Sequence, residues 1–503
     1  MDRKNKVLEI LIYICFFILI VSVILPRPIS DMDELWNYNF ARNVASGLLP
    51  YKDFNMVQMP LLPFICAIFL KVIGDELIVM RILASILCTA IMFLIYKIFT
   101  LLKIDKRVCF LLTSWIIFFS RDIFCIDYNW STLLIVLAIV YIELRNLEKN
   151  NYEQLVSNFK TDLIIGILAG LTVCLKQTTG LAICIVSVGY KLLLVKDKES
   201  LKKYIKILGY RILGVLLIII SLIIYLIASN SFKDWFEYTI LGIKYFDNAI
   251  EYYNLFNNKA YILRVLAVLI PVNFIYLYIK TIFLKQKYQT DKELFVLFVY
   301  GLSMFILVYP IADKIHFTIA GMISIISVLY MIYNILSKLK LDKKSFVVKE
   351  FAIYMVLLLV ILASVIYSIN NFLNYIQTES KSQEKHYKYI SINENLEKEI
   401  DEVDRFILEQ ESKGKKTIIL DAYACIYMIP IDKYNKDFDM LLKGNLGNNE
   451  TEKLINNLES QSNINILVRN NGNLNWQTPV NIIEYVKKSK TKTGSIVVFD
   501  IYN

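Results

Sequence analysis

The chain has 503 residues, 56% of them hydrophobic, and a net charge of +10. Its mean hydropathy of +0.51 is too high for a soluble protein of this size. The charge does not indicate nucleic acid, because residues 371–503 contain 17 basic and 19 acidic side chains and the basic excess belongs to the apolar part before them. No GxxxxGK[ST] loop, CxxC pair or Cys/His cluster occurs in the sequence, which argues against an ATP-driven pump and a zinc site.

The first long apolar run, Val7–Pro26, follows three basic residues and lacks the small-x-small pattern of a signal-peptidase site. We therefore expect an uncleaved membrane anchor. Leu61–Ile73 is apolar but too short to span a bilayer, and we expect a helix lying in the interface. The sequence predicts about eleven transmembrane helices, at 7–26, 77–100, 108–120, 129–144, 162–175, 178–195, 212–229, 261–279, 293–310, 317–336 and 350–370.

The distribution of basic residues predicts the orientation of these helices. With a cytoplasmic N-terminus, the inner segments contain 26 Lys and Arg residues and the outer segments contain 10, as the positive-inside rule requires. This count needs a break between two short helices at Lys176–Gly180 (KQTTG), since one helix over 162–195 would place seven basic residues outside. We expect a multi-pass protein of the cell membrane with an extracytoplasmic C-terminus.

Residues 371–503 predict a small extracytoplasmic α/β domain beside a membrane domain over 1–370. The first outer loop of that membrane domain, 27–76, is expected to contain juxtamembrane helices. In the C-terminal domain we expect a polar helix at about Ser391–Glu411. Strands are expected in TIILDAYACIYMI, INILVRN and GSIVVFDIY, alternating with helices in EKLINNLE and VNIIEYVKK.

In this topology the unusual polar residues gather at the outer membrane face. Charge is costly beside hydrocarbon, so acids and cations from separate loops at one face predict a polar site. The first loop supplies Asp31, Asp33, Glu34, Tyr51 and Asp53; later loops supply Arg121, Asp122, Asp127, Lys176, Gln177, Asp313 and His316; Arg81 and Arg264 lie at outer helix ends.

Each of these residues also has a structural alternative. An acid before a helix can be an N-cap, two neighbouring charges can form an interfacial ion pair, a lysine can snorkel, and a histidine can bond to a nearby carboxylate. The N-cap alternative applies to Asp31, Asp33 and Asp127, and the ion-pair alternative applies to Arg121 with Asp122. The snorkelling alternative applies to Lys176, and the histidine–carboxylate bond applies to His316 with Asp313.

The stretch from DMDELW to MRILASI resembles the N-terminal signature of the GT-C glycosyltransferases that use polyprenyl-phosphate sugars. These include the protein O-mannosyltransferases and the aminoarabinose transferase of lipid A. The pattern is an acidic pair after the first helix, G-x-x-P-Y-x-D, a Pro-rich juxtamembrane helix, a Gly, and an Arg opening the second helix. The matching residues are Asp33-Glu34, Gly47–Asp53, Pro60–Pro63, Gly74 and Arg81, and LKQTTG and YPIADKIHFTIAG are similar to later turns of these proteins.

The resemblance implies an α-helical GT-C-like membrane enzyme, an inverting hexosyl- or pentosyltransferase with a polyprenyl-phosphate donor and a cell-envelope acceptor. A carboxylate at the membrane edge can take the proton of the attacking hydroxyl or amine. We expect Asp33 to be this base, with Glu34 orienting the acceptor or acting as a second acid. The leaving phosphate needs a cation. The phosphate-binding candidates are Lys176, Arg81, Arg264 and His316, and the acceptor- or donor-binding candidates are Tyr51, Asp53, Asp127, Gln177 and Asp313.

Two other classes remain open at this point. A transporter or flippase of lipid-linked sugars should show repeated halves and polar residues near mid-membrane, and we find neither pattern in the sequence. A non-catalytic envelope protein that retains the fold is the other alternative. The expected partners are a polyprenyl-phosphate-linked sugar, an envelope glycan, lipid or protein acceptor, and membrane lipids, without nucleic acid. The sequence indicates no particular cofactor, although an outer carboxylate pair could hold a divalent cation.

Overall fold

The computed structural model describes residues 3–29, 32–242, 250–338, 343–378, 381–448, 450–470, 474 and 478–503. The chain divides into two compact units. A helical unit comprises Met1–Ile24, Ala84–Leu222 and Ala249–Leu373, and a mixed unit comprises Leu25–Leu83, Ile223–Asn248 and Asn374–Asn503. The boundary predicted at residue 370 stays a prediction.

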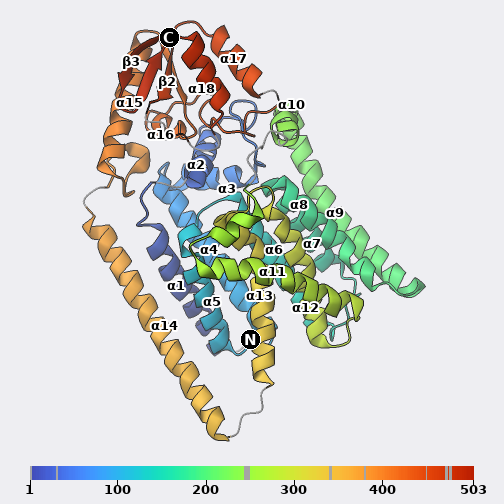
Figure 1. Cartoon of the computed structure of the whole chain (residues 1–503). Helices are drawn as coiled ribbons and strands as arrows, with labels where there is room; N and C mark the ends of the chain where they lie inside the picture. Colours follow the sequence, from blue (N-terminus) through green and yellow to red (C-terminus); the bar gives the residue numbers. More distant parts are fainter. Residues whose placement is uncertain are drawn as a thin grey trace. The chain divides into compact units, whose positions relative to one another are not determined.

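Every apolar run predicted to span the membrane contains a helix (Figure 1). Among the described residues, eight helices are long and apolar enough to cross a membrane, and the number of eleven stays a prediction because three are shorter. The eight are α1 (Arg3–Ile24), α4 (Leu77–Leu101), α6 (Tyr128–Lys149), α8 (Gln177–Gly189, extended by η2, Tyr190–Leu194), α9 (Lys198–Ala228), α11 (Tyr261–Tyr278, extended by η6, Ile279–Phe283), α13 (Lys314–Ser337) and α14 (Lys343–Gln377). The shorter three are α5 (Lys106–Ser120), α7 (Phe159–Leu175) and α12 (Gln289–Met304), followed by the 3-10 turns η1 (Arg121–Ile123) after α5 and η7 (Phe305–Val308) after α12.

The predicted break at Lys176 is present. Helix α7 ends at Leu175 and α8 begins at Gln177, while Lys176 between them has an extended backbone with φ −145° and ψ 111°. The two helices pack against each other. A Cβ atom on Gly180 would lie 2.4 Å from the backbone of Val173, so this turn depends on a residue without a side chain.

Helix α7 also packs closely against α9 through glycines spaced four residues apart. A Cβ atom on Gly166 would lie 2.2 Å from the carbonyl oxygen of Arg211, and one on Gly170 would lie 2.9 Å from Ile218. Gly214 on α9 approaches the backbone of α7 in the same way. Small residues at such spacing let helix backbones approach in membranes, where dispersion contacts replace the hydrophobic effect as the driving force.

A group of buried charges lies inside the helical unit, and the sequence analysis missed it. The Arg211 guanidinium lies 2.7 Å from a carboxylate oxygen of Glu143 and 3.0 Å from one of Asp162. Lys191 lies 3.4 Å from the second oxygen of Glu143. Two cations and two anions therefore neutralise each other between α6, α7, η2 and α9, which reduces the cost of burying them.

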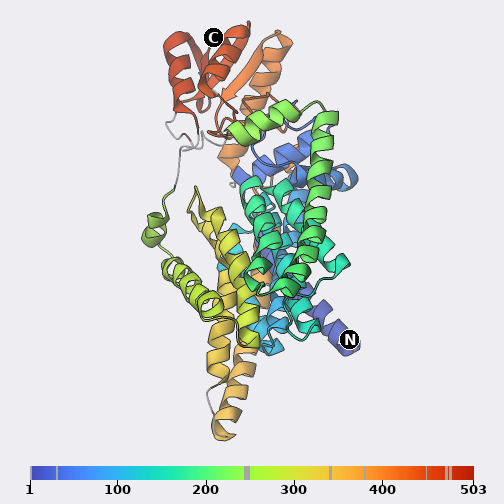
Figure 2. The ribbon, with the colours of Figure 1, turned by 90° about the vertical axis from the view of Figure 1, so that its right-hand side faces the viewer.

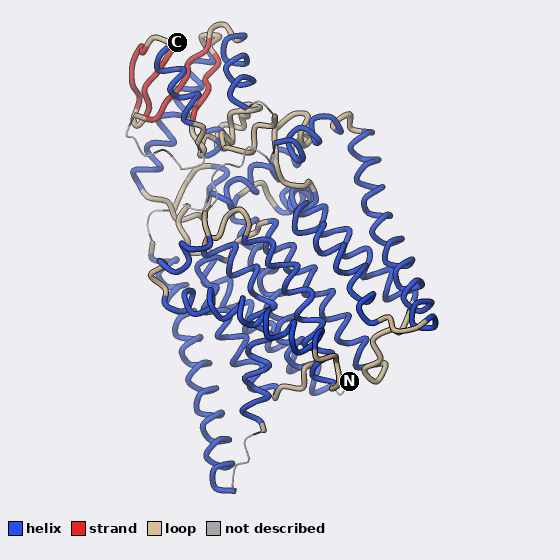
Figure 3. Tube along the Cα trace, turned by 45° about the vertical axis from the view of Figure 1, so that its right-hand side comes forward, coloured by secondary structure: helices blue, strands red, loops and turns tan. Residues whose placement is uncertain are grey.

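The mixed unit contains the acidic helix α2 (Met32–Ala45) and the apolar helix α3 (Leu61–Ile73), whose bounds match the predicted interfacial segment. Two further short helical segments are α10 (Phe232–Trp235) and the π-helical segment η3 (Phe236–Leu241). All four strands in the described part of the chain belong to the C-terminal segment (Figure 3).

These strands form one sheet in the order β1-β2-β4-β3, with β1 and β2 parallel and the other pairs antiparallel. Helices α17 and α18 cover one face and α15 covers the other (Figure 2). Apolar side chains alternate along the central strands to serve both faces. The elements are α15 (Glu394–Ser412), β1 (Lys416–Leu420), α16 (Cys425–Met428), α17 (Glu450–Ser460), β2 (Ile464–Arg469), α18 (Val480–Ser489), β3 (Lys492–Ile496) and β4 (Phe499–Tyr502).

Two predicted strands differ in the structure. The run TIILDAYACIYMI is a strand only to Leu420, because Asp421 accepts a hydrogen bond from the Tyr423 amide and turns the chain into the buried helix α16. GSIVVFDIY contains parts of two antiparallel strands, joined by a turn at Val497 with a φ of 47°. A β-branched residue rarely takes this conformation, so the turn carried no sequence signal.

We expect Gly166→Ala to lower the stability of the protein, because the added methyl group meets the Arg211 carbonyl. Overpacking of this kind costs about 1–3 kcal/mol. Thermal unfolding of the purified protein in detergent measures the loss. Gly189→Ala is the matched control, because no atom lies within 4 Å of its Cβ position; equal melting temperatures for the two variants would contradict the close crossing.

Candidate functional site

Side chains from the ends of three helices meet in the helical unit. Asp127 caps α6: one oxygen accepts from the Trp130 amide at 2.6 Å and the other accepts from the Asn129 side chain at 3.2 Å. The Asn129 carbonyl accepts in turn from the Lys176 ammonium at 2.9 Å, and this ammonium lies 4.9 Å from the centre of the Tyr128 ring. We name Asp127, Asn129, Lys176, Asp313 and His316 the helix-end cluster.

Burial sets the protonation of the carboxylates in the helix-end cluster. Asp127 is 0% exposed, and burial raises its pKa to about 6, although the charges of His316 and Lys176 oppose the rise. Asp313 caps α13 and lies 2.9 Å from Nδ1 of His316. Burial acts to raise the pKa of Asp313, but hydrogen bonds from the side chain and backbone of His316 hold it below its usual value. The cluster thus combines a lysine and a histidine with two acids of different strength.

Several structural alternatives are confirmed as contacts. Asp127 and Asp313 are N-caps, and His316 bonds to Asp313 as expected for an interfacial histidine. Arg121 lies 3.5 Å from Asp122, which also pairs with a lysine on α13. The site roles of these residues stay predictions.

In the mixed unit, Glu34 and Arg81 form a buried ion pair. Nε and Nη2 of Arg81 each lie 2.9 Å from a different carboxylate oxygen of Glu34. The Arg81 side chain is 1% exposed and also donates to the carbonyl oxygens of Leu25, Arg27 and Pro28. Arg81 would have to leave Glu34 to reach a phosphate, so the described geometry gives this pair a structural role.

The remaining predicted residues of the mixed unit lie in or before α2 and in the loop after it. Asp33 lies in the first turn of α2 and is half-buried, and Asp31 lies outside the described residues. Tyr51 is buried with a positive φ of 71° and donates to the Gln58 carbonyl, while Asp53 accepts from the Leu49 amide at 2.7 Å. These two residues hold the shape of the loop.

Two predicted residues of the helical unit remain. Gln177 is the first residue of α8, next to Lys176. Arg264 lies in the first turn of α11, where it donates to the Asn258 carbonyl and lies over the Tyr261 ring. Arg264 lines an open apolar groove on α11 and is not part of the helix-end cluster.

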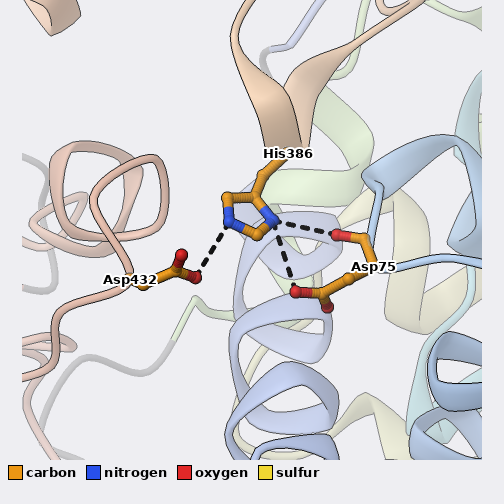
Figure 4. A group of neighbouring side chains, drawn as sticks. All are labelled: Asp75, His386 and Asp432. Atoms are coloured by element: carbon orange, nitrogen blue, oxygen red, sulfur yellow. Dashed lines mark hydrogen bonds and ion pairs between the residues drawn. The ribbon is translucent and has the colours of Figure 1, made fainter.

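A second cluster, in the mixed unit, was missed by the sequence analysis. His386 is fully buried between Asp75 and Asp432 (Figure 4). Its Nδ1 lies 3.0 Å from the Asp75 carbonyl and 3.4 Å from the Asp75 carboxylate, and its Nε2 lies 2.9 Å from the Asp432 carboxylate. A carbonyl can only accept, so Nδ1 carries a proton. No spacing signal exists, since Asp75 lies 311 residues from His386 and Asp432 lies 46 residues from it.

The contacts of His386 fit a charge network better than a metal site. A cation would need both carboxylates near one ring nitrogen, whereas they lie at opposite nitrogens (Figure 4). Arg42 lies 2.7 Å from Asp432 and 3.7 Å from Asp75, and Lys385 also pairs with Asp432. Burial acts to raise the pKa of Asp432, but the Lys385 and Arg42 hydrogen bonds hold it below its usual value. These cations already compensate the carboxylates.

Comparison with known proteins identifies the fold. The chain is similar to the oligosaccharyltransferase AglB of Archaeoglobus fulgidus, both in its apo form and in complex with an inhibitory peptide and a dolichol-phosphate. In both comparisons the TM-score is 0.52, the sequence identity is 12%, and the match covers 93% of this chain and 70% of AglB. A complex of AglB with zinc and sulfate matches with a TM-score of 0.47. No family model and no curated protein sequence matches. The chain therefore has a GT-C fold, as the first-loop motif predicted, and at this identity the match speaks for the fold alone.

We expect Arg81→Leu and Glu34→Leu each to destabilise the protein strongly, because each leaves a buried charge without its partner. Breaking such a pair costs about 3–5 kcal/mol. The double variant should regain much of the loss, and thermal unfolding of the four proteins measures the coupling. Additive losses would show that the two residues act independently.

We expect Asp127 to titrate near pH 6, not near its usual value of 3.8. The folded protein binds this proton more tightly than the unfolded chain, so the contribution of Asp127 to stability falls as the pH rises from about 4 to about 6. Infrared difference spectra should show a protonated-carboxyl band that disappears through this range and is absent in Asp127→Asn. Asp404 and Asp439, whose pKa burial raises to about 8, keep their bands to higher pH. Identical spectra for the two proteins would contradict the assignment.

Proposed function

We propose that the chain is a membrane glycosyltransferase that transfers a sugar from a polyprenyl-phosphate donor to a cell-envelope acceptor. The observation that carries this proposal is the helix-end cluster, where an ammonium at a helix break donates to an amide that a buried carboxylate orients. The GT-C fold supports it, and the complex of AglB with a dolichol-phosphate shows a lipid phosphate on a neighbour of the same fold. The acceptor is a glycan, lipid or protein.

Lys176 is the proposed phosphate-binding residue. Its ammonium is half-buried and is held by Asn129, which Asp127 orients in turn. An ammonium keeps donors for more than one acceptor, so Lys176 can contact a phosphate oxygen while it remains bound to Asn129. The cation would stabilise the polyprenyl phosphate as the bond from the anomeric carbon to the phosphate oxygen breaks. His316 is the second cation candidate of the same cluster.

Asp33 is the proposed base. The acceptor hydroxyl or amine gives its proton to the Asp33 carboxylate while its oxygen or nitrogen attacks the anomeric carbon, and the polyprenyl phosphate leaves. The role of Glu34 is then to hold Arg81 and the start of α2, with Asp33 one residue before it. A single displacement of this kind inverts the configuration at the anomeric carbon, so the proposed enzyme is an inverting glycosyltransferase.

The orientation of the chain and the use of a metal are also proposals. The basic residues support a cytoplasmic N-terminus and an extracytoplasmic C-terminal segment. Asp75, His386 and Asp432 have ligand atoms within 4.8 Å of one another and are the residues that would hold a divalent cation if their present charge network opened. Titration with Mg²⁺ or Zn²⁺ would test this, and the proposed transfer step uses no metal.

We expect Lys176→Gln to weaken use of the donor more than use of the acceptor. A charge-assisted hydrogen bond contributes about 1.5–3 kcal/mol, so kcat/KM for the donor should fall by about ten- to a hundredfold. The assay uses purified protein in lipid with a polyprenyl-phosphate sugar. Lys103→Gln is the control, because Lys103 is an exposed partner of Glu148. Unchanged donor kinetics in Lys176→Gln would contradict phosphate binding by Lys176 and would show that this lysine only snorkels to the membrane interface.

We expect Asp33→Asn to fold and bind donor but to lose about two to four orders of magnitude in turnover, as for other general bases. Asn has nearly the same shape as Asp, and Asp33 is only half-buried in the first turn of α2, so folding should be retained. Asp31→Asn is the control, with at most a few-fold loss. An active Asp33→Asn beside an inactive Asp31→Asn would show that Asp31 is the base. Two active variants would show that neither of these two carboxylates is the base.

A further inference from the structure

A small pocket lies at the carboxyl ends of the two parallel strands of the mixed unit. Asp421 follows the last residue of β1, and Arg469 is the last residue of β2. Strands β1 and β2 are paired in register up to Leu420 and Val468, so the two polar residues are neighbours. The edge where parallel strands end is a recurrent place for ligand binding in α/β sheets. The pocket has a volume of about 280 Å³.

Four polar side chains form a connected network on the pocket wall. Nε of Arg469 lies 2.5 Å from a carboxylate oxygen of Asp421, and its Nη2 lies 3.0 Å from the Tyr427 hydroxyl. Tyr427 donates to Oε1 of Glu399 on α15, and the other Asp421 oxygen accepts from the Tyr423 amide. These contacts fix the side chains before any ligand arrives, which lowers the entropic cost of binding.

The network leaves one donor and one acceptor for a ligand. Within the described residues, Nη1 of Arg469 and Oε2 of Glu399 have no hydrogen-bond partner, whereas their neighbouring atoms are engaged. Both residues line the pocket, beside the Tyr423 side chain and aliphatic side chains that include Leu396. A hydroxyl group donates and accepts. Two neighbouring hydroxyls of a sugar ring can therefore satisfy Nη1 and Oε2 together, while the apolar side chains cover the face of the ring.

The charge and size of the pocket narrow the ligand. Asp421 and Glu399 carry two negative charges against the one positive charge of Arg469, which disfavours an anionic ligand. The volume is just below the about 300–1,000 Å³ of pockets for drug-sized ligands. We infer that this pocket binds one sugar unit, either neutral or bearing an amine, of the glycan substrate. The inference rests on the proposed glycosyltransferase function for the identity of the ligand as a substrate.

The test measures binding of single sugars to the full chain in lipid nanodiscs, without any donor. D-glucose, D-glucosamine and D-glucuronate are compared by saturation-transfer NMR. Glucosamine should bind with a Kd of about 1 mM, a typical affinity for few contacts, and glucose about tenfold more weakly, because only the amine gains from the Glu399 charge. Glucuronate should bind at least about tenfold more weakly than glucose. Leu396→Trp fills the pocket and should abolish binding. Leu408→Trp is the matched control, because Leu408 lies on the same helix and is exposed.

Glu399→Gln provides a second readout, since it removes the charge that favours an amine while keeping an acceptor. The preference for glucosamine over glucose should fall by about tenfold. Absence of saturable binding, equal binding to Leu396→Trp and Leu408→Trp, or preferred binding of glucuronate would each overturn the inference. The assay contains no donor, so sugar binding without transfer would reject the proposed function alone, and transfer without sugar binding would reject the pocket alone.

Discussion

The break between α7 and α8 at Lys176 is the constraint on which the helical unit depends. An extended backbone at this one residue ends α7, and the missing side chain at Gly180 lets α8 return against α7. The ammonium is thereby brought to Asn129 and to the Asp127 cap of α6. Because of this break the number of predicted membrane spans is odd, and the C-terminal segment is therefore expected on the opposite side of the membrane from the N-terminus.

Several buried charges in the described structure are neutralised by a neighbouring side chain of opposite charge. Glu34 pairs with Arg81, Glu143 and Asp162 share Arg211 with Lys191 nearby, and the carboxylates around His386 face two cations, Arg42 and Lys385. An isolated charge in such places would cost several kcal/mol (about 3–5 on removing a partner). The helix-end cluster differs, because Asp127 keeps a pKa of about 6 despite its cationic neighbours. A buried carboxylate whose pKa stays raised beside an ammonium suits a site that receives a charged ligand.

Local patterns allowed much of the fold to be predicted. The bounds of helix α3 were predicted correctly because length and apolarity suffice, and the break at Lys176 followed from the count of basic residues. The GT-C fold followed from the first-loop motif. Contacts between distant residues could not be predicted: the pair of Glu34 and Arg81, the contacts of His386 with Asp75 and Asp432, and the pair of Arg469 and Asp421 join positions 46 or more residues apart. The β3–β4 turn was missed because Val497 has no turn propensity.

The central claim is that this chain cleaves the bond between a sugar and a polyprenyl phosphate. The most direct measurement follows both products in one experiment, with purified protein in sealed proteoliposomes, a donor labelled in its sugar, and an envelope extract as acceptor. The account predicts that label moves to the acceptor and that polyprenyl phosphate is released in equal amount. Passage of the intact donor across the bilayer, with its label still on the lipid, would contradict the account and show a flippase.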